Sequence, residues 1–179
     1  MNKIKKFEIW SAVFTIIVGS LLHFVFAWSQ EWKPLAIFAA VNESTWEHLK
    51  LAFWPALLMT LIGWRMFAKD HSIISKNFCF AQAKKLYMMP MLIVALFYGW
   101  RYFFADNFVY DISIFMVAVI AGHYTAYKLE TGSFVWGMKK FAFVAIVLLA
   151  LAFALLTFFP PKCFLFHDPV SSGYGIINN

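Results

Sequence analysis

Five apolar runs, each long enough to cross a membrane, constrain this chain more than any other feature. They cover residues 9–28, 46–67, 86–104, 108–127 and 140–159. Each is close to the roughly 20 residues that a helix needs to cross a hydrocarbon core of about 30 Å. Their apolar residues are continuous rather than alternating, which favours helices over barrel strands. We therefore predict an all-α, polytopic membrane bundle of about five transmembrane helices, forming one domain over residues 1–179.

Composition and charge agree with this class. Hydrophobic residues make up 63% of the 179 positions and charged residues 13%, whereas soluble domains average about 45–50% and about 25%. The net charge is +6. Because the lysines lie mostly in short connections between the apolar runs, this charge does not indicate a nucleic-acid partner, and none is expected.

The lysines also predict the orientation of the bundle. They gather before the first run, between the second and third, and between the fourth and fifth: Lys3, Lys5, Lys6, Lys69, Lys76, Lys84, Lys85, Lys128, Lys139 and Lys140. Cytoplasmic loops carry the excess of Lys and Arg. We therefore expect the N-terminus in the cytoplasm and the C-terminus outside. Cys79 and Cys163 would then lie on opposite sides of the membrane and could not pair.

A polar motif, Asn42-Glu43-Ser44-Thr45-Trp46-Glu47-His48, stands at the start of the second run. Ionisable groups are costly near a bilayer and rarely occur there without a role. Ser44 and Glu47 have the spacing of a capping box, which is the structural alternative for Glu47. That alternative leaves Asn42, Glu43 and His48 unexplained.

Helix geometry places the motif at the same depth as a second histidine. His23 lies five residues before Trp28, about 7 Å below the outer end of the first helix at 1.5 Å per residue. His48 lies about one turn inside the next helix, which runs in the opposite direction. We therefore predict that His23, Glu43 and His48 converge just beneath the outer surface.

Imidazoles and carboxylates at one depth suit a divalent metal, which we expect to be Zn²⁺. In this interpretation His23, His48 and Asp111 are metal ligands, and Glu43 and Glu47 are the catalytic groups, one of them a general base. Five further residues are candidates for substrate binding: Asn42, Trp46, Arg101, His167 and Asp168. The motif lacks the paired histidines of His-Glu-x-x-His.

Three functions fit these residues. The leading hypothesis is a membrane-embedded, zinc-dependent hydrolase that acts on a lipid or membrane peptide near the outer leaflet. The first alternative is a carrier or binding protein for a small solute or ion that uses the same outer cluster, with His123 as its inner station. The second is a structural membrane protein in which the polar groups only form interhelical hydrogen bonds.

The C-terminal tail contains aromatic residues, an Asp-Pro turn at Asp168 and glycines that permit tight bends. We predict that it folds back over the outer mouth of the bundle. The motif at 41–50, together with 165–169 and the Gly-Tyr-Gly-Ile at 173–176, resembles a family of small bacterial integral membrane proteins of unknown function. That resemblance implies a multi-pass protein of the bacterial cytoplasmic (inner) membrane, surrounded by membrane lipids, and assigns no activity.

The mixture of His and acidic residues on membrane helices is also broadly similar to membrane zinc hydrolases of the ceramidase and receptor-like type. Those proteins have seven spans, whereas five are predicted here. The ligand spacing differs as well, so this similarity is an analogy.

Overall fold

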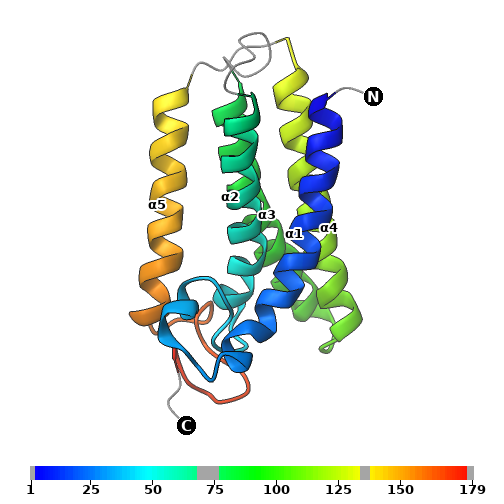
Figure 1. Ribbon diagram of the computed structural model, residues 1–179. Coiled ribbons are helices and arrows are strands. Elements are labelled where there is room, and N and C mark those ends of the chain that lie inside the picture. Colours follow the sequence, from blue (N-terminus) through cyan, green and yellow to red (C-terminus); the bar gives the residue numbers. More distant parts are fainter. Residues whose placement is uncertain (1–2, 68–76, 134–137, 177–179) are drawn as a thin grey trace.

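The structure is a computed structural model that describes residues 3–67, 77–133 and 138–176. Five long helices and one short 3-10 helix make up this part of the chain (Figure 1). They are α1 (Lys3–Trp28), η1 (Lys33–Ile37), α2 (Thr45–Phe67), α3 (Phe78–Phe103), α4 (Phe108–Thr131) and α5 (Lys139–Phe158). The predicted all-α class is confirmed.

Four helices, α1, α3, α4 and α5, are long and apolar enough to cross a membrane. The fifth, α2, is 23 residues long but carries Glu47, Lys50 and Arg65. It stands between α1 and α5 in Figure 1 and is the most enclosed helix, since more than half of its residues are buried, against three in α5. Glu47 and Lys50 are tolerated on this helix because protein surrounds both side chains, whereas Arg65 is exposed near its end.

The start of α3 differs from the sequence prediction. Lys84 and Lys85 were expected in a cytoplasmic loop before residue 86, but the helix begins at Phe78. Lys85 is completely buried, and its Nζ lies 3.5 Å from a carboxylate oxygen of Glu8 in α1. The predicted boundary was wrong because it treated every lysine as solvated, whereas this one is paired inside the bundle.

Successive long helices run in opposite directions. The polar motif at the start of α2 therefore lies beside the ends of neighbouring helices. The end of α1, the start of α2, the end of α3 and the start of α4 come together at the lower end of Figure 1. Residues 159–176 lie at the same end. We call this the pocket end, and the end that carries the start of α1 the N-terminal end.

The C-terminal tail folds back onto the start of α2, as predicted. The backbone N–H of Trp46 donates to the carbonyl of Leu165 (2.9 Å), and Asn42 Nδ2 donates to the carbonyl of Gly175 (2.8 Å). The rings of Trp46 and Phe166 stack with their centroids 4.6 Å apart. Backbone and side-chain contacts therefore fix the tail at the pocket end.

Candidate functional site

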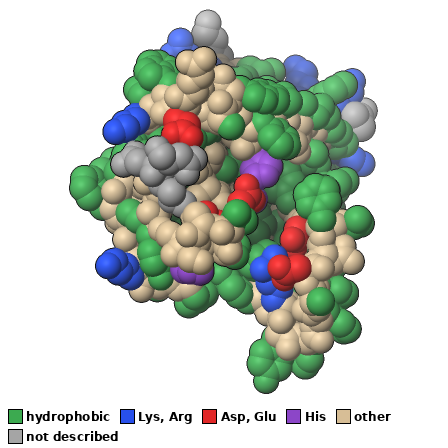
Figure 2. All heavy atoms as spheres, turned by 90° about the horizontal axis from the view of Figure 1, so that it is seen from below, with side chains coloured by type: hydrophobic (Ala, Val, Ile, Leu, Met, Phe, Trp, Pro, Cys, Tyr) green, Lys and Arg blue, Asp and Glu red, His purple; other side chains and the backbone are tan. Residues whose placement is uncertain are grey.

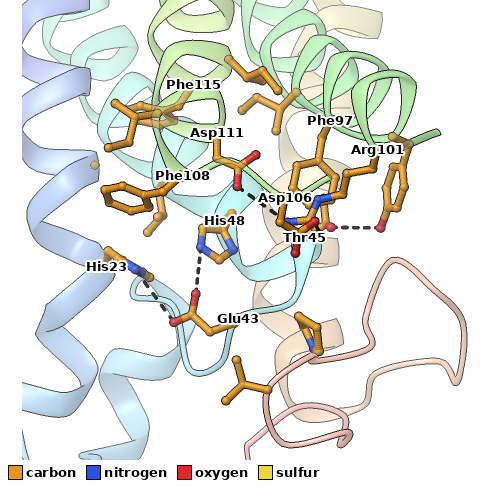
Figure 3. A pocket seen from close by; sticks show the side chains of 18 of the residues that line it. His23, Glu43, Thr45, His48, Phe97, Arg101, Asp106, Phe108, Asp111 and Phe115 are labelled. Atoms are coloured by element: carbon orange, nitrogen blue, oxygen red, sulfur yellow. Dashed lines mark hydrogen bonds and ion pairs between the residues drawn. The ribbon is translucent and has the colours of Figure 1, made fainter. Parts of the chain in front are cut away.

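A pocket of about 610 Å³ lies at the pocket end, between α1, α2, α3, α4 and the tail (Figure 3). Figure 2 views the molecule from this end and shows acidic and histidine side chains near the middle of a face with a largely hydrophobic rim. The polar side chains that line the pocket are His23, Ser20, Glu43, Thr45, His48, Tyr98, Arg101, Asp106, Asp111 and His167.

Three of these side chains form a tight cluster, the His–Glu–His cluster of His23, Glu43 and His48. His23 Nε2 lies 3.9 Å from Glu43 Oε1, and His48 Nε2 lies 3.4 Å from Glu43 Oε2. One ligand atom from each residue lies within 4.8 Å of the other two. Figure 3 shows both imidazoles directed at the carboxylate. The convergence predicted from helix rise and chain direction is confirmed.

The loop before α2 fixes the position of Glu43. Asn42 Oδ1 accepts a hydrogen bond from the backbone N–H of Ser44 (2.8 Å), which makes a tight turn around Glu43. The side-chain hydrogen bond with His48 holds the pKa of the Glu43 carboxyl below its ordinary value and outweighs burial, which acts in the opposite direction. Glu43 is therefore a carboxylate at neutral pH and can serve as an anionic ligand.

His48 is oriented by the same turn. Its Nδ1 lies 2.9 Å from the backbone carbonyl of Ser44. A carbonyl only accepts, so Nδ1 carries the proton and Nε2 is the nitrogen that can bind a metal. Ligating histidines commonly have such a backbone partner on the second nitrogen. His23 differs, because its Nδ1 is buried and has no hydrogen-bond partner in the described part of the chain.

A second group of charged residues lies opposite the cluster. Arg101 Nη1 is 3.2 Å from Asp106 Oδ1, and Nη2 is 3.7 Å from Asp111 Oδ2. The guanidinium stands 4.1 Å from the centroid of the Phe97 ring. Asp111, predicted as a metal ligand, lies outside the His–Glu–His cluster and pairs with Arg101 instead. Both residues line the pocket, where Asp111 is a candidate base and Arg101 a candidate anion-binding group.

The first turns of α2 divide their side chains between two faces. Thr45, His48 and Leu51 recur every three residues and line the pocket. Glu47 and Lys50, also three residues apart, face η1 and α5 instead. This division follows from about 3.6 residues per turn, and it separates the two glutamates of the motif.

Glu47 was predicted to be catalytic, with a capping box as the alternative. It is 2% exposed, and its Oε2 lies 2.6 Å from Lys50 Nζ. The carboxylate also accepts from the N–H of Val41 (3.1 Å) and from Thr157 Oγ1 (3.1 Å). The backbone N–H of Ser44, which a capping box would pair with Glu47, donates to Asn42. Glu47 is outside the pocket lining, in a buried ion pair within α2, and both members of the pair hydrogen-bond to Thr157 of α5.

The sequence reasoning missed Lys50. Its Nζ is fully buried and also donates to the carbonyl of Ala36 (2.7 Å) and to Thr157 Oγ1 (2.8 Å). A lysine three residues after a glutamate, inside an apolar run, was the available signal, because a buried lysine needs a partner.

The remaining predicted residues fall into two groups. His167 lines the pocket, whereas Asn42, Trp46 and Asp168 are outside its lining. Trp46 packs against Phe166 and Phe153, with ring centroids 4.6 and 4.7 Å away. Burial raises the pKa of Asp168, but hydrogen bonds from Ser171 and the Val170 backbone outweigh it and leave the pKa below its ordinary value. Asp168 thus holds the tail turn.

The model of a family of unknown function, DUF6512, matches residues 1–176. The chain belongs to DUF6512. The expected membership in a family without an assigned function is confirmed. No curated protein and no solved structure matched the chain significantly, so the function of this DUF6512 chain has to be argued from its own residues.

This DUF6512 chain has a second set of polar groups, four of them ionisable, toward the N-terminal end. We call it the buried network; its members are the buried Glu8, Gln82, Lys85 and His123 together with the partly buried Glu130. His123 Nδ1 lies 2.6 Å from Glu8 Oε2, and Gln82 Nε2 donates to Glu8 (2.8 Å) and to Glu130 (2.6 Å). His123, the inner station in the carrier hypothesis, lies on α4 and contacts Glu8 of α1. The sequence reasoning missed Glu8 and Lys85.

Proposed function

We propose that this protein is a multi-pass membrane hydrolase in which His23, Glu43 and His48 hold a zinc ion. The observation that supports it is the convergence of three ligand atoms within 4.8 Å at the edge of a 610 Å³ pocket. Catalytic zinc sites use three protein ligands and keep a fourth position for water. Two imidazoles and one carboxylate are such a set. The zinc would lie between His48 Nε2 and the Glu43 carboxylate, which are 3.4 Å apart.

The reaction proposed is cleavage of an ester or amide bond. A zinc ion held by His23, Glu43 and His48 would supply a water acidic enough to act as a nucleophile near neutral pH. The Asp111 carboxylate would accept a proton from the attacking water, whose oxygen would bond to the carbonyl carbon as the bond from that carbon to the leaving oxygen or nitrogen breaks. The leaving group takes the proton back from Asp111. Arg101 is placed to stabilise negative charge on the substrate.

The proposed setting is the bacterial inner membrane, with all five helices crossing it and the N-terminus in the cytoplasm. Lysines in the first turn of α1 and around the connections α2–α3 and α4–α5 support this orientation. The pocket end then lies at the outer leaflet. Its substrate would be a lipid or a membrane peptide.

One observation favours a second candidate, a proton-coupled carrier. The buried network sets ionisable residues from α1, α3 and α4 inside the bundle, and such residues often mark proton or ion pathways. His123 Nε2 lies 3.5 Å from Thr15 Oγ1, one turn from the pocket residue Gly19. A carrier would need both ends of this route, whereas the hydrolase needs only the pocket end.

Metal analysis of the purified protein tests the proposal. We expect about one zinc per chain, as in a three-ligand site with one open position. His48→Ala should lose the zinc while the helical circular dichroism remains. His167→Ala, which changes a pocket histidine outside the cluster, should keep it and serves as the matched control. Zinc that is absent from the folded protein, or retained in His48→Ala, would disprove the metal site.

A further inference from the structure

The pocket is polar at its mouth and apolar one helical turn deeper. On each of α1, α2 and α4, a polar lining residue near the mouth has an apolar lining residue three or four positions further into the bundle. At 1.5 Å per residue, the apolar residue is about 5–6 Å deeper. The pairs are His23 and Gly19, His48 and Leu51, and Asp111 and Phe115. A ligand that fits this gradient has a polar part and a hydrocarbon part.

The apolar floor is closed by close helix packing at Gly19. A Cβ at this position would lie 2.5 Å from the carbonyl oxygen of Leu51 and 2.9 Å from Cζ of Phe115. Only glycine lets α1 come so near to α2 and to the Phe115 ring. The pocket therefore ends at this level, which suits the end of a bound chain better than passage of a solute.

The side of the pocket between α1 and α4 faces outward. Phe24, Phe108 and Ile112 line the pocket and yet are 50%, 76% and 44% exposed. The two helices touch near the N-terminal end, where His123 meets Glu8, and diverge toward the pocket end (Figure 1). Figure 3 shows Phe108 reaching from α4 toward α1. An apolar, outward-facing wall on membrane helices is in contact with lipid, so the pocket wall continues into the lipid-facing surface.

We propose that the pocket takes a membrane lipid, which enters sideways between α1 and α4 and lays an acyl chain against the floor of Gly19, Leu51 and Phe115. The volume of 610 Å³ is within the roughly 300–1,000 Å³ of ligand pockets. The polar part of the lipid reaches the His–Glu–His cluster and Arg101, whose Nε–H has no partner in the described residues. This inference rests on the proposed function for the membrane placement, and it narrows the substrate to an acyl lipid.

Photolabelling of the full chain tests the inference. The protein is placed in phosphatidylcholine nanodiscs that contain a small share of phosphatidylcholine with a diazirine at the end of one acyl chain. After illumination, mass spectrometry locates the label. We expect label on the floor residues Leu51 and Phe115, which face into the bundle. Label confined to lipid-facing positions, such as those of α5, would overturn the inference.

A pair of variants makes the test specific. Ile112→Trp fills the opening on α4 and should abolish labelling of the floor. Val117→Trp, on the same helix and 53% exposed but outside the pocket lining, should leave it unchanged. Both variants should unfold at the temperature of the parent protein. Floor labelling that survives Ile112→Trp would contradict entry between α1 and α4.

Labelling and metal analysis of the same preparation of the parent protein separate this inference from the proposed function. Floor label in a parent protein that holds no zinc would support the lipid pocket and reject the zinc hydrolase. Bound zinc in the parent protein without floor label would reject the lipid pocket alone.

Discussion

Two glutamates four residues apart, Glu43 and Glu47, have opposite environments. The Glu43 side chain is 48% exposed and faces two imidazoles across the pocket, whereas Glu47 is 2% exposed and is paired with Lys50. Each carboxylate has protein partners, but only the partners of Glu43 are imidazoles that line a pocket. An acidic residue next to a histidine in the sequence is therefore a weak indicator of a catalytic or metal site. A better indicator is a carboxylate or imidazole that lines a pocket and can still bind a ligand there.

The buried network also shows that ionisable residues close together need not form a ligand site. It contains more ionisable groups than the His–Glu–His cluster, yet its members bind mainly one another, as in the 2.6 Å contact between His123 and Glu8. Such groups hold helices together because separation would leave buried charges without partners. The pocket cluster has the same residue types and leaves room for a ligand.

The largest expected effect is on stability at the Glu47–Lys50 pair. Glu47→Gln keeps the shape but leaves the Lys50 charge uncompensated in the interior, which should cost about 3–5 kcal/mol of unfolding free energy. Denaturant unfolding in detergent would measure it. The double variant Glu47→Gln with Lys50→Met removes both charges and should recover most of the loss. A Glu47→Gln protein as stable as the parent would show that the pair is not buried as described.

Glu43→Gln should give the opposite result. Because Glu43 is half exposed, we expect its unfolding free energy to change by less than about 0.5 kcal/mol. Zinc binding should be lost, since the amide is a far poorer ligand than the carboxylate. Metal content and unfolding would be measured on the same preparation. A stable Glu43→Gln protein that retains zinc and activity would falsify the role of this motif as a chemical site.

Asn42 links the Glu43 turn to the tail through hydrogen bonds between neutral groups, so its variants should lose less stability than Glu47→Gln. Asn42→Ala removes the hydrogen bonds to Ser44 and Gly175 and should cost about 1 kcal/mol for each. Asn42→Asp keeps the acceptor for Ser44 and loses only the donor to Gly175. Hydrogen exchange should therefore rise in the tail for both variants, and around Glu43 only for Asn42→Ala. Equal exchange around Glu43 in the two variants would contradict the assigned roles.

Cysteine labelling tests the placement of the pocket end and perturbs the protein least. Both cysteines are unpaired, and Cys163 is exposed in the tail, whereas Cys79 is partly buried at the start of α3. A membrane-impermeant thiol reagent should modify Cys163 from outside intact cells. Cys79 should react only from the cytoplasmic side, and slowly. Labelling of both cysteines from the same side would contradict an odd number of membrane crossings between Cys79 and Cys163.

The sequence was sufficient for the existence of the helices and for the convergence of His23, Glu43 and His48, because these depend on local hydropathy and on the fixed rise of a helix. It was insufficient where a partner comes from a distant element. Lys85 looked like a loop lysine because its partner, Glu8, lies on another helix. Glu47 looked available for catalysis because Thr157 and Ala36, which complete its ion pair with Lys50, lie on α5 and η1.

The direction of each side chain determines which residues of the motif line the pocket. Residues 45–51 form about two turns, and one face of those turns lines the pocket while another meets α5. The spacing of Thr45, His48 and Leu51 shows that these three residues share one face of the helix. Which face lines the pocket depends on where α1 and α4 pack, and the spacing does not give that.

The contact of the tail with the start of α2 has a consequence for biogenesis. A ribosome makes the chain from its N-terminus, so His23, Glu43 and His48 are synthesised long before Phe164 and His167, which complete one wall of the pocket. Those residues reach the pocket end only after α5 has been made and packed. A nascent chain thus carries the His–Glu–His cluster without an enclosed pocket, and the protein gains a finished pocket only at the last stage of its synthesis.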